Sequence, residues 1–461
     1  MYYLQNRWKL DGKLLRYYGL RNKPYMFKNT VRLSGAQLKI VAELPCELSA
    51  EELKTMKPLL GHQVVSEAEL RHTPKSLEEA RFCKHCAAND FIIPGIEFDE
   101  NGLCPMCATA KETAELKSVV PVKNTFETCK KSRFDVAVFY TGGKDSTFLL
   151  YYLSKVLKLR VLAMIWEIPF MSQSAKMSIE GAKKSLSGVE FITRRVCDDD
   201  LKKIYRHLYA IAGNTCACPS LAYILFYPEL VANKVPYFVV GNEPAQLMGL
   251  YYNHMAPKYA YTFGTGKLFN FIISSGRLLT LHPPLKNGQF HTLATMKQLA
   301  YGDNPLKNLA GYQNTLVHNV VEAIHQVPHM VKPLKRAIRR SSLSGNIPAF
   351  VQVDFNEVCG GSYDWKAIKD TIVAECGWVP PEDLDKGLHT SCCIEKCKEY
   401  SQFIRFYNME STMIPFSALE ISLATRDKAI TKEQAIAEIK STLGFSLTEL
   451  PECEIMKDYI K

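Results

Sequence analysis

The sequence predicts an α/β protein built on a doubly wound parallel sheet. From Phe134 onwards, short apolar runs such as DVAVFY, RVLAMIWEI and VEFITRRV alternate with longer helical runs such as STFLLYYLSKVLK and AKMSIEGAKKSL. A further apolar run, PYFVVGN, follows the helical run SLAYILFYPELVANK. Short β-rich runs separated by helices are typical of parallel sheets that are covered by helices.

Length and composition are those of a globular protein of several domains. The chain has 461 residues, of which 47% are apolar and 23% charged, and this length predicts roughly two to four domains. No apolar run approaches the roughly 18 residues needed to span a bilayer, and the start MYYLQNRWKLDGK lacks the apolar core of a secretion signal. We therefore expect a cytoplasmic protein without a membrane partner. The net charge of +10 suits an anionic partner, such as a nucleic acid or a phosphorylated ligand, and specifies neither.

The N-terminal part is predicted to form a small α+β module. Ser49 and Glu52 fit a capping box that opens a helix, and a short strand HQVVSEAEL follows, so the order helix, helix, strand resembles a winged-helix module. The basic run KPLKRAIRR is interpreted as a solvated helix face rather than a nucleic-acid patch. The predicted ranges are this module at 1–80, a cysteine-paired knuckle at 81–111, a polar linker at 112–132, the sheet domain at 132–284 and a mostly helical region at 285–461 that completes the active site.

A glycine-rich turn, TGGKDS, lies between the first predicted strand of the sheet and its first helix. Glycines let the backbone turn tightly and bring its N–H groups close to an anion, and the helix that follows adds the positive end of its dipole. Lys144 adds a full positive charge, and the hydroxyls of Thr141 and Ser146 add donors. The spacing is not that of the Walker loop. The turn therefore predicts a phosphate site of another nucleotide class.

TGGKDS resembles the SGGKDS signature of the PP-loop ATP pyrophosphatases, the superfamily of asparagine synthetase, GMP synthetase and the tRNA-thiolating enzymes, with Thr141 in place of the first serine. The resemblance implies a sheet of PP-loop (HUP-like) type that binds ATP and Mg²⁺. It also implies that RVLAMIWEI ends near the adenine and that VVGNEPAQ brings an acidic residue to the metal. Lys144 and Asp145 are the implied catalytic residues. The implied nucleotide-binding residues are Thr141, Gly142, Gly143, Lys144, Asp145, Ser146, Met164, Trp166, Gly241, Asn242 and Glu243.

In that superfamily the loop binds the pyrophosphate that leaves, while a substrate oxygen attacks the α-phosphate of ATP. The product is an adenylated carbonyl, and because AMP leaves more readily than a carbonyl or amide oxygen, nitrogen or sulfur can then replace it. Lys144 and Mg²⁺ would stabilise the charge on the departing pyrophosphate. The resemblance therefore implies an enzyme that cleaves ATP to AMP and pyrophosphate.

Two Cys-x-x-Cys pairs, Cys83/Cys86 and Cys104/Cys107, are separated by 17 residues. This spacing fits a site in which four thiolates bind one Zn²⁺ ion. Such an ion would fold a segment that is too short to make its own core. We therefore expect a structural zinc site here.

The segment around these cysteines, FCKHCAANDFIIPGIEFDENGLCPMC, resembles the opening motif of the N-acetyl sugar amidotransferases, a PP-loop family with an I-x-F-D-E-x-G-x-C core. SALEISLATRDKAITKEQAIAEI at 417–439 resembles the closing helical segment of related enzymes. Residues 1–80 and much of 285–345 lie outside the likeness. The resemblance implies transfer of ammonia to a small-molecule substrate. A separate glutaminase subunit would supply the ammonia, because EVCGGSY around Cys359 lacks the G-x-C-x-G order of a glutaminase nucleophile.

Other cysteines support sulfur as the alternative nucleophile. In the cysteine-dependent tRNA-thiolating branch a C-x-x-C pair holds an iron–sulfur cluster or carries sulfur, and NTCACPS resembles that segment with a C-x-C spacing. Buried thiols are the competing interpretation, because reactivity needs a lowered pKa. A sulfur-donor protein would then be the partner. The candidate catalytic cysteines are Cys216, Cys218, Cys392 and Cys393.

Three hypotheses follow from these motifs. The first is an amidotransferase that acts on a small molecule such as an acetamido sugar. The second is a sulfurtransferase that forms a thioamide or thiocarbonyl on a peptide, a base or a small molecule. The third is a non-catalytic nucleic-acid or peptide binder, which leaves the intact TGGKDS loop unexplained.

Overall fold

The computed structural model describes most of the chain. The described residues form two compact units, Met1–Glu115 with Glu399–Glu452 and Leu116–Lys398 with Cys453–Lys461. The predicted ranges 1–80 and 81–111 both lie in the first unit, and 285–461 is divided between the two. No helix in the described part is long and apolar enough to cross a membrane. The residues not described are 27, 115–118, 121–125, 127–131, 213–216, 243, 255–266, 303–314, 354, 362, 382–391 and 443–453.

The second unit is built on a parallel sheet with the strand order β6-β11-β10-β7-β8-β9. All neighbouring strands in it pair in parallel, which confirms the predicted parallel sheet. The chain runs outward from β7 to β9 and then returns to β10 on the other side of β7, so the strand order reverses between β7 and β10. The strands are β6 (Val119–Val120), β7 (Val136–Phe139), β8 (Val161–Trp166), β9 (Val189–Arg194), β10 (Tyr237–Val240) and β11 (Ala349–Val353).

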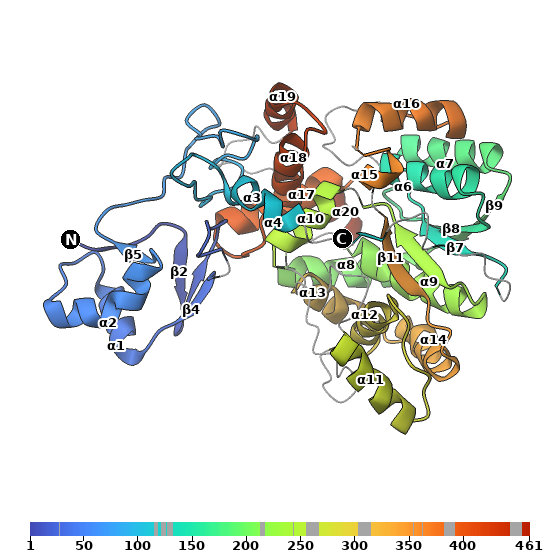
Figure 1. The fold of residues 1–461 in the computed structure, drawn as a ribbon, viewed down its shortest axis with the longest axis horizontal. Helices are drawn as coiled ribbons and strands as arrows, with labels where there is room; N and C mark the ends of the chain where they lie inside the picture. The colour runs from blue at the N-terminus through green and yellow to red at the C-terminus, as the bar shows by residue number, and fades with distance from the viewer. Residues whose placement is uncertain are drawn as a thin grey trace. The chain divides into compact units, whose positions relative to one another are not determined.

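Helices cover both faces of this sheet (Figure 1). A large apolar cluster that includes Phe139, Phe226 and Ile338 fills the space between one face of the sheet and the helices that carry Phe226 and Ile338. On one face lie α6 (Lys144–Tyr151), the π-helix η1 (Tyr152–Val156), α7 (Gln173–Ser185) and α16 (Trp365–Cys376). On the other lie α8 (Asp198–Ala212), α9 (Cys218–Ala232), α12 (Gln289–Tyr301), α13 (Thr315–Ile324) and α14 (Val331–Ser344). The unit also contains α10 (Pro244–Tyr252), α11 (Lys267–Leu279), α15 (Phe355–Val358) and α20 (Glu454–Ile460).

The sheet extends beyond the range in which the sequence placed it. β11 lies in the region expected to be mostly helical, and its segment AFVQV has alternately buried and half-buried residues. It pairs with β10 on one side and with β6 on the other, and β6 lies in the range expected to be a linker. The sequence analysis missed β6 because it has only two residues, and it missed β11 because that strand is short and stands between helices.

The start of the first unit is an antiparallel sheet followed by two helices. The predicted capping box at Ser49 and Glu52 is present, and Ser34 and Gln37 form a second one. The strands before these helices were not predicted. The elements are β1 (Tyr3–Leu4), which pairs with β5 (Val65–Ser66), the sheet β2 (Trp8–Asp11), β3 (Leu14–Tyr17) and β4 (Thr30–Arg32), and the helices α1 (Gly35–Glu43) and α2 (Ala50–Gly61).

The rest of the first unit joins two segments that are far apart in the sequence. Lys432 donates a hydrogen bond from Nζ to the carbonyl oxygen of Cys83 (2.7 Å), and the guanidinium of Arg426 donates to the carbonyl oxygen of Met106 (3.2 Å). The opening and closing segments that resemble amidotransferases therefore lie in contact. The elements here are α3 (Pro105–Ala108), α4 (Ala110–Ala114), α17 (Glu395–Tyr407), which begins in the second unit, α18 (Phe416–Arg426) and α19 (Lys432–Thr442).

Candidate nucleotide and metal sites

The TGGKDS loop lies at the carboxyl end of β7 and leads into α6. Gly142 has a φ of +76°, and a Cβ at this position would lie 2.5 Å from the carbonyl oxygen of Ala175 in the first turn of α7. Gly143 is the N-cap residue of α6. The glycine at position 142 is therefore required both by its left-handed conformation and by the close approach of α7. Together these features let the loop turn directly from strand to helix.

The hydroxyl groups of the loop bond to its own backbone. Ser146 Oγ accepts a hydrogen bond from the Thr141 amide (3.3 Å), and Thr141 Oγ1 accepts one from the Gly143 amide (3.3 Å). From outside the loop, Trp378 donates a hydrogen bond from Nε1 to the carbonyl oxygen of Gly142 (3.0 Å). The hydroxyls predicted to bind phosphate thus also hold the loop in shape.

Gly241 brings the second predicted segment against this loop. It follows β10, the strand on the other side of the reversal in strand order, and a Cβ at this position would lie 2.7 Å from the backbone nitrogen of Ser146. Asn242 is half-buried beside it, and the predicted Glu243 lies outside the described residues. In open α/β sheets, ligands bind at the carboxyl ends of the strands where the strand order reverses. The loop and the segment after β10 meet at that place.

Lys144 is held by groups that the sequence analysis did not identify. Its Nζ is 2.5 Å from Asp145 Oδ1 and also bonds to the hydroxyl of Tyr363. The same hydroxyl donates to Asp145, and Nζ lies 4.9 Å and 5.1 Å from the ring centroids of Tyr363 and Trp365. An incoming phosphate must therefore compete with Asp145 and Tyr363 for the Lys144 amine.

The segment before Tyr363 gave a partial signal for this contact. Gly360 and Gly361 have φ values of +79° and +125°, which favour glycine. Tyr363 lies 219 residues after Lys144 in the chain, so spacing alone could not pair the two. The sequence feature that could have indicated this contact is the Gly-Gly pair that precedes Tyr363 and Trp365.

The residues predicted to lie near the adenine are both buried. Met164 is 1% exposed and Trp166 is 9% exposed, and both belong to the apolar cluster of the second unit. Nε1 of Trp166 is buried and has no hydrogen-bond partner among the described residues. At the carboxyl end of β8, Trp166 therefore presents an indole donor that a ligand could use.

The structure describes three of the four cysteines that the sequence predicts to handle sulfur. Cys218 is half-buried at the start of α9, and Cys216 lies outside the described residues. Cys392 is buried and forms an isolated β-bridge with Met171, and the Cys393 amide donates to the carbonyl oxygen of Phe170 (2.7 Å). Phe170 and Met171 follow β8, so Cys392 and Cys393 lie beside the segment that leaves the carboxyl end of that strand.

Cys359 does not have the properties of a nucleophile. It is half-buried near the end of α15, and burial raises the pKa of its thiol to about 11. The nucleophilic form of cysteine is the thiolate, and a pKa this high leaves the thiol protonated at neutral pH. The departure from a glutaminase sequence is therefore matched by an unsuitable environment.

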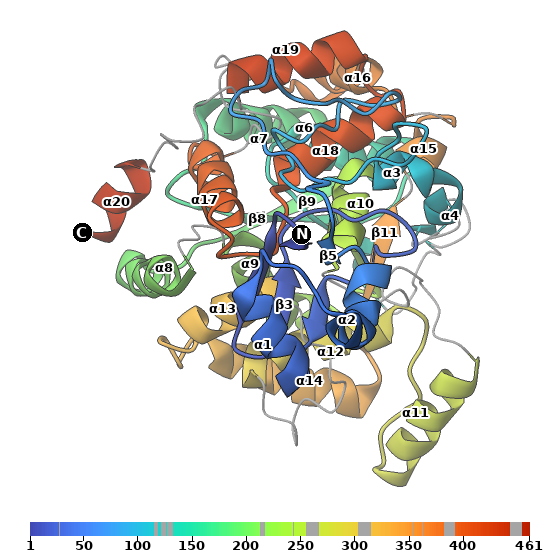
Figure 2. The ribbon, with the colours of Figure 1, turned by 90° about the vertical axis from the view of Figure 1, so that its left-hand side faces the viewer.

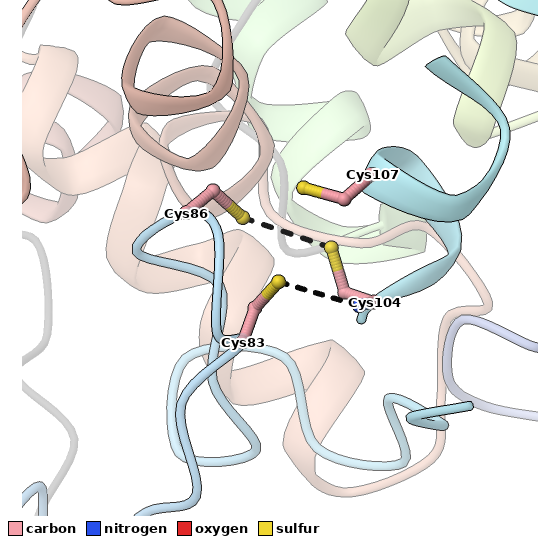
Figure 3. A group of neighbouring side chains, drawn as sticks. All are labelled: Cys83, Cys86, Cys104 and Cys107. Atoms are coloured by element: carbon pink, nitrogen blue, oxygen red, sulfur yellow. Dashed lines mark hydrogen bonds between the residues drawn. The ribbon is translucent and has the colours of Figure 1, made fainter. Parts of the chain in front are cut away.

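The four cysteines of the predicted knuckle converge (Figure 3). Their Sγ atoms all lie within 4.8 Å of one another, and those of Cys86 and Cys104 are 3.6 Å apart. Backbone amides of Cys104 and His85 donate to the sulfur of Cys83 at 3.3 Å and 3.4 Å. The first of these contacts is drawn in Figure 3. These donors stabilise negative charge on sulfur.

The electrostatics of the cluster fit a cation. Hydrogen bonds from the neighbouring thiols, first that of Cys104, lower the pKa of Cys83 strongly, whereas the pKa of Cys104 is raised, first by Cys107. One thiolate is thus favoured, whereas hydrogen bonds with the other thiols and burial oppose ionisation of Cys104. A metal–sulfur bond of about 2.3 Å in tetrahedral geometry separates the sulfurs by about 3.8 Å. The observed spacing fits one metal ion, whereas a four-iron cluster binds its thiolates to four separate irons and needs a wider set.

Comparisons with known proteins gave several partial structural matches. No protein-family model matches the chain, and no curated protein matches it significantly. The fold is similar to a glutamine-dependent NAD+ synthetase from Acinetobacter baumannii in complex with ADP, at 15% identity over 50% of this chain and 44% of that chain, with a TM-score of 0.22. It is also similar to the U34-tRNA thiolase NcsA from Methanococcus maripaludis with its 4Fe-4S cluster, at 15% identity over 58% of this chain and 86% of that chain, with a TM-score of 0.23.

Both of these proteins are enzymes, and this chain spans less than half the length of the synthetase. At such identity and TM-scores the matches carry no conclusion about the reaction. The function is therefore proposed from the residues of this chain.

Gly241→Ala should destabilise the second unit, because the added Cβ would collide with backbone of the loop rather than with a movable side chain. We expect a loss of about 1–3 kcal/mol in the free energy of unfolding, measured by urea denaturation. Gly188→Ala is the matched control, because a Cβ there meets nothing within 4 Å. Equal stability of the two variants would contradict the close contact between Gly241 and the loop.

Proposed function

We propose that this chain is a PP-loop ATP pyrophosphatase that adenylates a carbonyl or amide oxygen of its substrate, releases pyrophosphate and then replaces AMP by nitrogen. The observation that carries the proposal is the position of the TGGKDS loop, at the reversal of strand order and in contact with Gly241. Backbone amides and the N-terminus of α6 offer an anion site there. A plain structural turn would not need Lys144, Asp145 and Ser146 together.

The residues at the loop support a stepwise role in releasing pyrophosphate. Lys144 would move its amine from Asp145 and Tyr363 to the phosphate, where its charge stabilises the leaving group. Asp145, whose side chain is 15% exposed, would then hold Mg²⁺, because Mg²⁺ prefers carboxylate oxygens. Mg²⁺ would neutralise phosphate charge when bound. Tyr363 would keep its bond to Asp145 and so orient that carboxylate.

Nitrogen is the proposed nucleophile because one segment resembles the opening motif of the N-acetyl sugar amidotransferases and another resembles the closing helical segment of related enzymes. The contacts Lys432–Cys83 and Arg426–Met106 join these segments in one unit, which supports their origin as one module. The substrate would be a small molecule with an amide or carbonyl oxygen. Ammonia would come from a separate glutaminase subunit, because EVCGGSY lacks the residue order of a glutaminase nucleophile and burial raises the pKa of its Cys359.

Sulfur is the second candidate nucleophile, and one observation favours it. Cys392 and Cys393 lie against residues that follow β8, and the phosphate loop follows the neighbouring strand β7. The carboxyl ends of parallel strands share one edge of the sheet, so these cysteines and the loop lie along the same edge. A persulfide on one of these cysteines could displace AMP from an adenylated substrate, and a second thiol would then release the transferred sulfur by forming a disulfide. An iron–sulfur cluster at that edge is the alternative source of sulfur.

We also propose that the cluster of Cys83, Cys86, Cys104 and Cys107 holds one Zn²⁺ ion. The thiolate donor set, the short spacing between the sulfurs and the amide donors all fit a structural zinc site. The ion would cross-link the two ends of the segment 83–107, each of which carries one cysteine pair.

Lys144→Ala should weaken the binding of Mg²⁺–ATP about 10- to 100-fold, because it removes the charged donor to the phosphates. The affinity is measured by isothermal titration calorimetry, which needs no knowledge of the second substrate. Lys184→Ala, an exposed lysine on α7, is the control and should bind as the wild type does. ATP binding that is unchanged in Lys144→Ala would refute the loop assignment. Absence of ATP binding in the wild type, with salt-dependent nucleic-acid binding, would favour the non-catalytic hypothesis.

Cys393→Ser tests whether an iron–sulfur cluster delivers sulfur at this edge of the sheet. In that case, anaerobically purified protein contains iron and acid-labile sulfide, and Cys393→Ser loses both while retaining ATP binding. Cys197→Ser, an exposed cysteine, should retain them. Under the nitrogen hypothesis, which we favour, neither variant changes the metal content. A loss of iron and sulfide confined to Cys393→Ser would overturn that preference.

Cys83→Ser should abolish binding of zinc, because a tetrahedral site that loses a thiolate loses most of its affinity. Metal analysis of the wild type should give about one zinc ion per chain, and Cys46→Ser, a half-buried cysteine of the same unit, should keep it. The thermal stability of Cys83→Ser should fall as well. If Cys83→Ser retains a full equivalent of zinc, the ion is bound elsewhere.

A further inference from the structure

Helix α11 packs against the rest of the second unit through one of its faces. Ile273 packs against the large apolar cluster. The guanidinium of Arg277 donates to the carbonyl oxygens of Pro283 (2.7 Å) and Ser342 (3.0 Å). Ile273 and Arg277 are four residues apart and so lie on the same face of the helix. That face attaches α11 to the rest of the unit. Figure 2 shows the helix at the edge of the ribbon.

The opposite side of α11 exposes large apolar residues. Leu268, Phe271 and Ile272 are 74%, 69% and 58% exposed, and Leu279 is 88% exposed. At 100° per residue these four side chains fall within one stripe, about 100° wide and far from Ile273 and Arg277 around the helix axis. Leu278 and Leu281, 58% and 88% exposed, extend the apolar surface at the C-terminal end. Isolated exposed leucines need no explanation, but a continuous stripe marks an interaction surface.

The sequence segments that contain α11 and α14 carry basic residues and no acidic ones. The sequence contains no Asp or Glu between Glu243 and Asp303, although it has five Lys and Arg residues there. Helix α14, which Arg277 contacts at Ser342, belongs to a second acid-free segment between Glu322 and Asp354. Its exposed basic residues are Lys332, Arg336, Arg339 and Arg340.

We propose that α11 and the basic face of α14 form a docking surface for an anionic lipid bilayer, with α11 lying in the plane of the interface. An apolar stripe on a helix that lies in an acid-free segment and contacts a basic helix is the pattern of interfacial helices. Anionic lipids attract the arginines, and the apolar side chains enter the headgroup boundary. With 13 residues, α11 is too short to span the bilayer.

Other occupants fit these observations less well. A second copy that packed the same face against itself would bring two cationic surfaces together, which opposes association. Nucleic acid would pair with the arginines but would leave the apolar stripe in water. The proposal differs from the expectation of no membrane partner, which rested on the absence of a spanning segment. It is independent of the proposed reaction.

The test uses the full chain and two kinds of vesicle, phosphatidylcholine mixed with phosphatidylglycerol and phosphatidylcholine alone. We expect co-sedimentation with the anionic vesicles that weakens as salt is added. The triple variant Leu268→Ser, Phe271→Ser, Leu279→Ser should lower the partition coefficient at least about tenfold. The control variant Met177→Ser, Val373→Ser changes exposed apolar residues on α7 and α16 and should bind as the wild type does.

The charged component is tested by the variant Arg336→Gln, Arg339→Gln, Arg340→Gln. Each removed charge should lower binding to anionic vesicles roughly fivefold. Phe271→Trp provides a direct readout of insertion, because brominated lipids should quench its added fluorescence. Val373→Trp on α16 is the control and should not be quenched beyond the wild type.

Three results would overturn the proposal. The first is failure of the wild type to bind anionic vesicles at low salt. The second is binding that the triple serine variant retains in full. The third is concentration-dependent dimerisation, seen by analytical ultracentrifugation, that the triple serine variant abolishes, because the stripe would then be covered by a second copy. The substituted side chains are exposed, so the variants should keep the wild-type Tm, and this is checked first.

Discussion

The close approach of backbone to backbone around the TGGKDS loop is the constraint on which the candidate site depends. Gly142 lets α7 approach the loop from one side, and Gly241 lets the chain after β10 approach from the other. A single methyl group at either position would meet backbone atoms at 2.5–2.7 Å. Because backbone cannot rotate away as a side chain can, these two contacts fix where the N-terminus of α6 points. The position of Lys144 and Ser146 follows from that direction.

The sequence predicted the features that depend on local chemistry. TGGKDS indicated a strand, a tight turn and a helix, and all three are present as β7, the loop and α6. The four paired cysteines indicated a metal site, and their sulfurs converge. The strand, turn and helix and the convergence of the four cysteines are confirmed, because a glycine turn and a Cys-x-x-Cys pair determine the geometry of the residues next to them.

The features that depend on distant parts of the chain could not be predicted in this way. Tyr363 and Trp365 reach Lys144 from a segment more than 200 residues away, and nothing in the pattern around them specifies a lysine partner. β11 was missed because its five residues stand between helices, and only pairing with β10 identifies it as part of the sheet. The outward stripe of α11 shows the same limit. Its amphipathic spacing would ordinarily predict a buried face, and which face is buried is decided by the contacts of Ile273 and Arg277.

The two groups of cysteines differ in how far the fold prepares them for a metal. In the first unit, backbone amides already point at the sulfur of Cys83, and the thiol spacing matches a single ion. In the second unit, Cys392 and Cys393 are held by backbone contacts to the segment after β8, and no three of the described cysteines there lie within ligating distance. Cysteines that the fold already holds at ligand spacing need little rearrangement to bind a metal, and such a site suits a permanent structural ion. The preorganisation of the first group therefore supports the zinc proposal, whereas the preference for nitrogen rests on the two segments that resemble amidotransferases and meet through the contacts Lys432–Cys83 and Arg426–Met106.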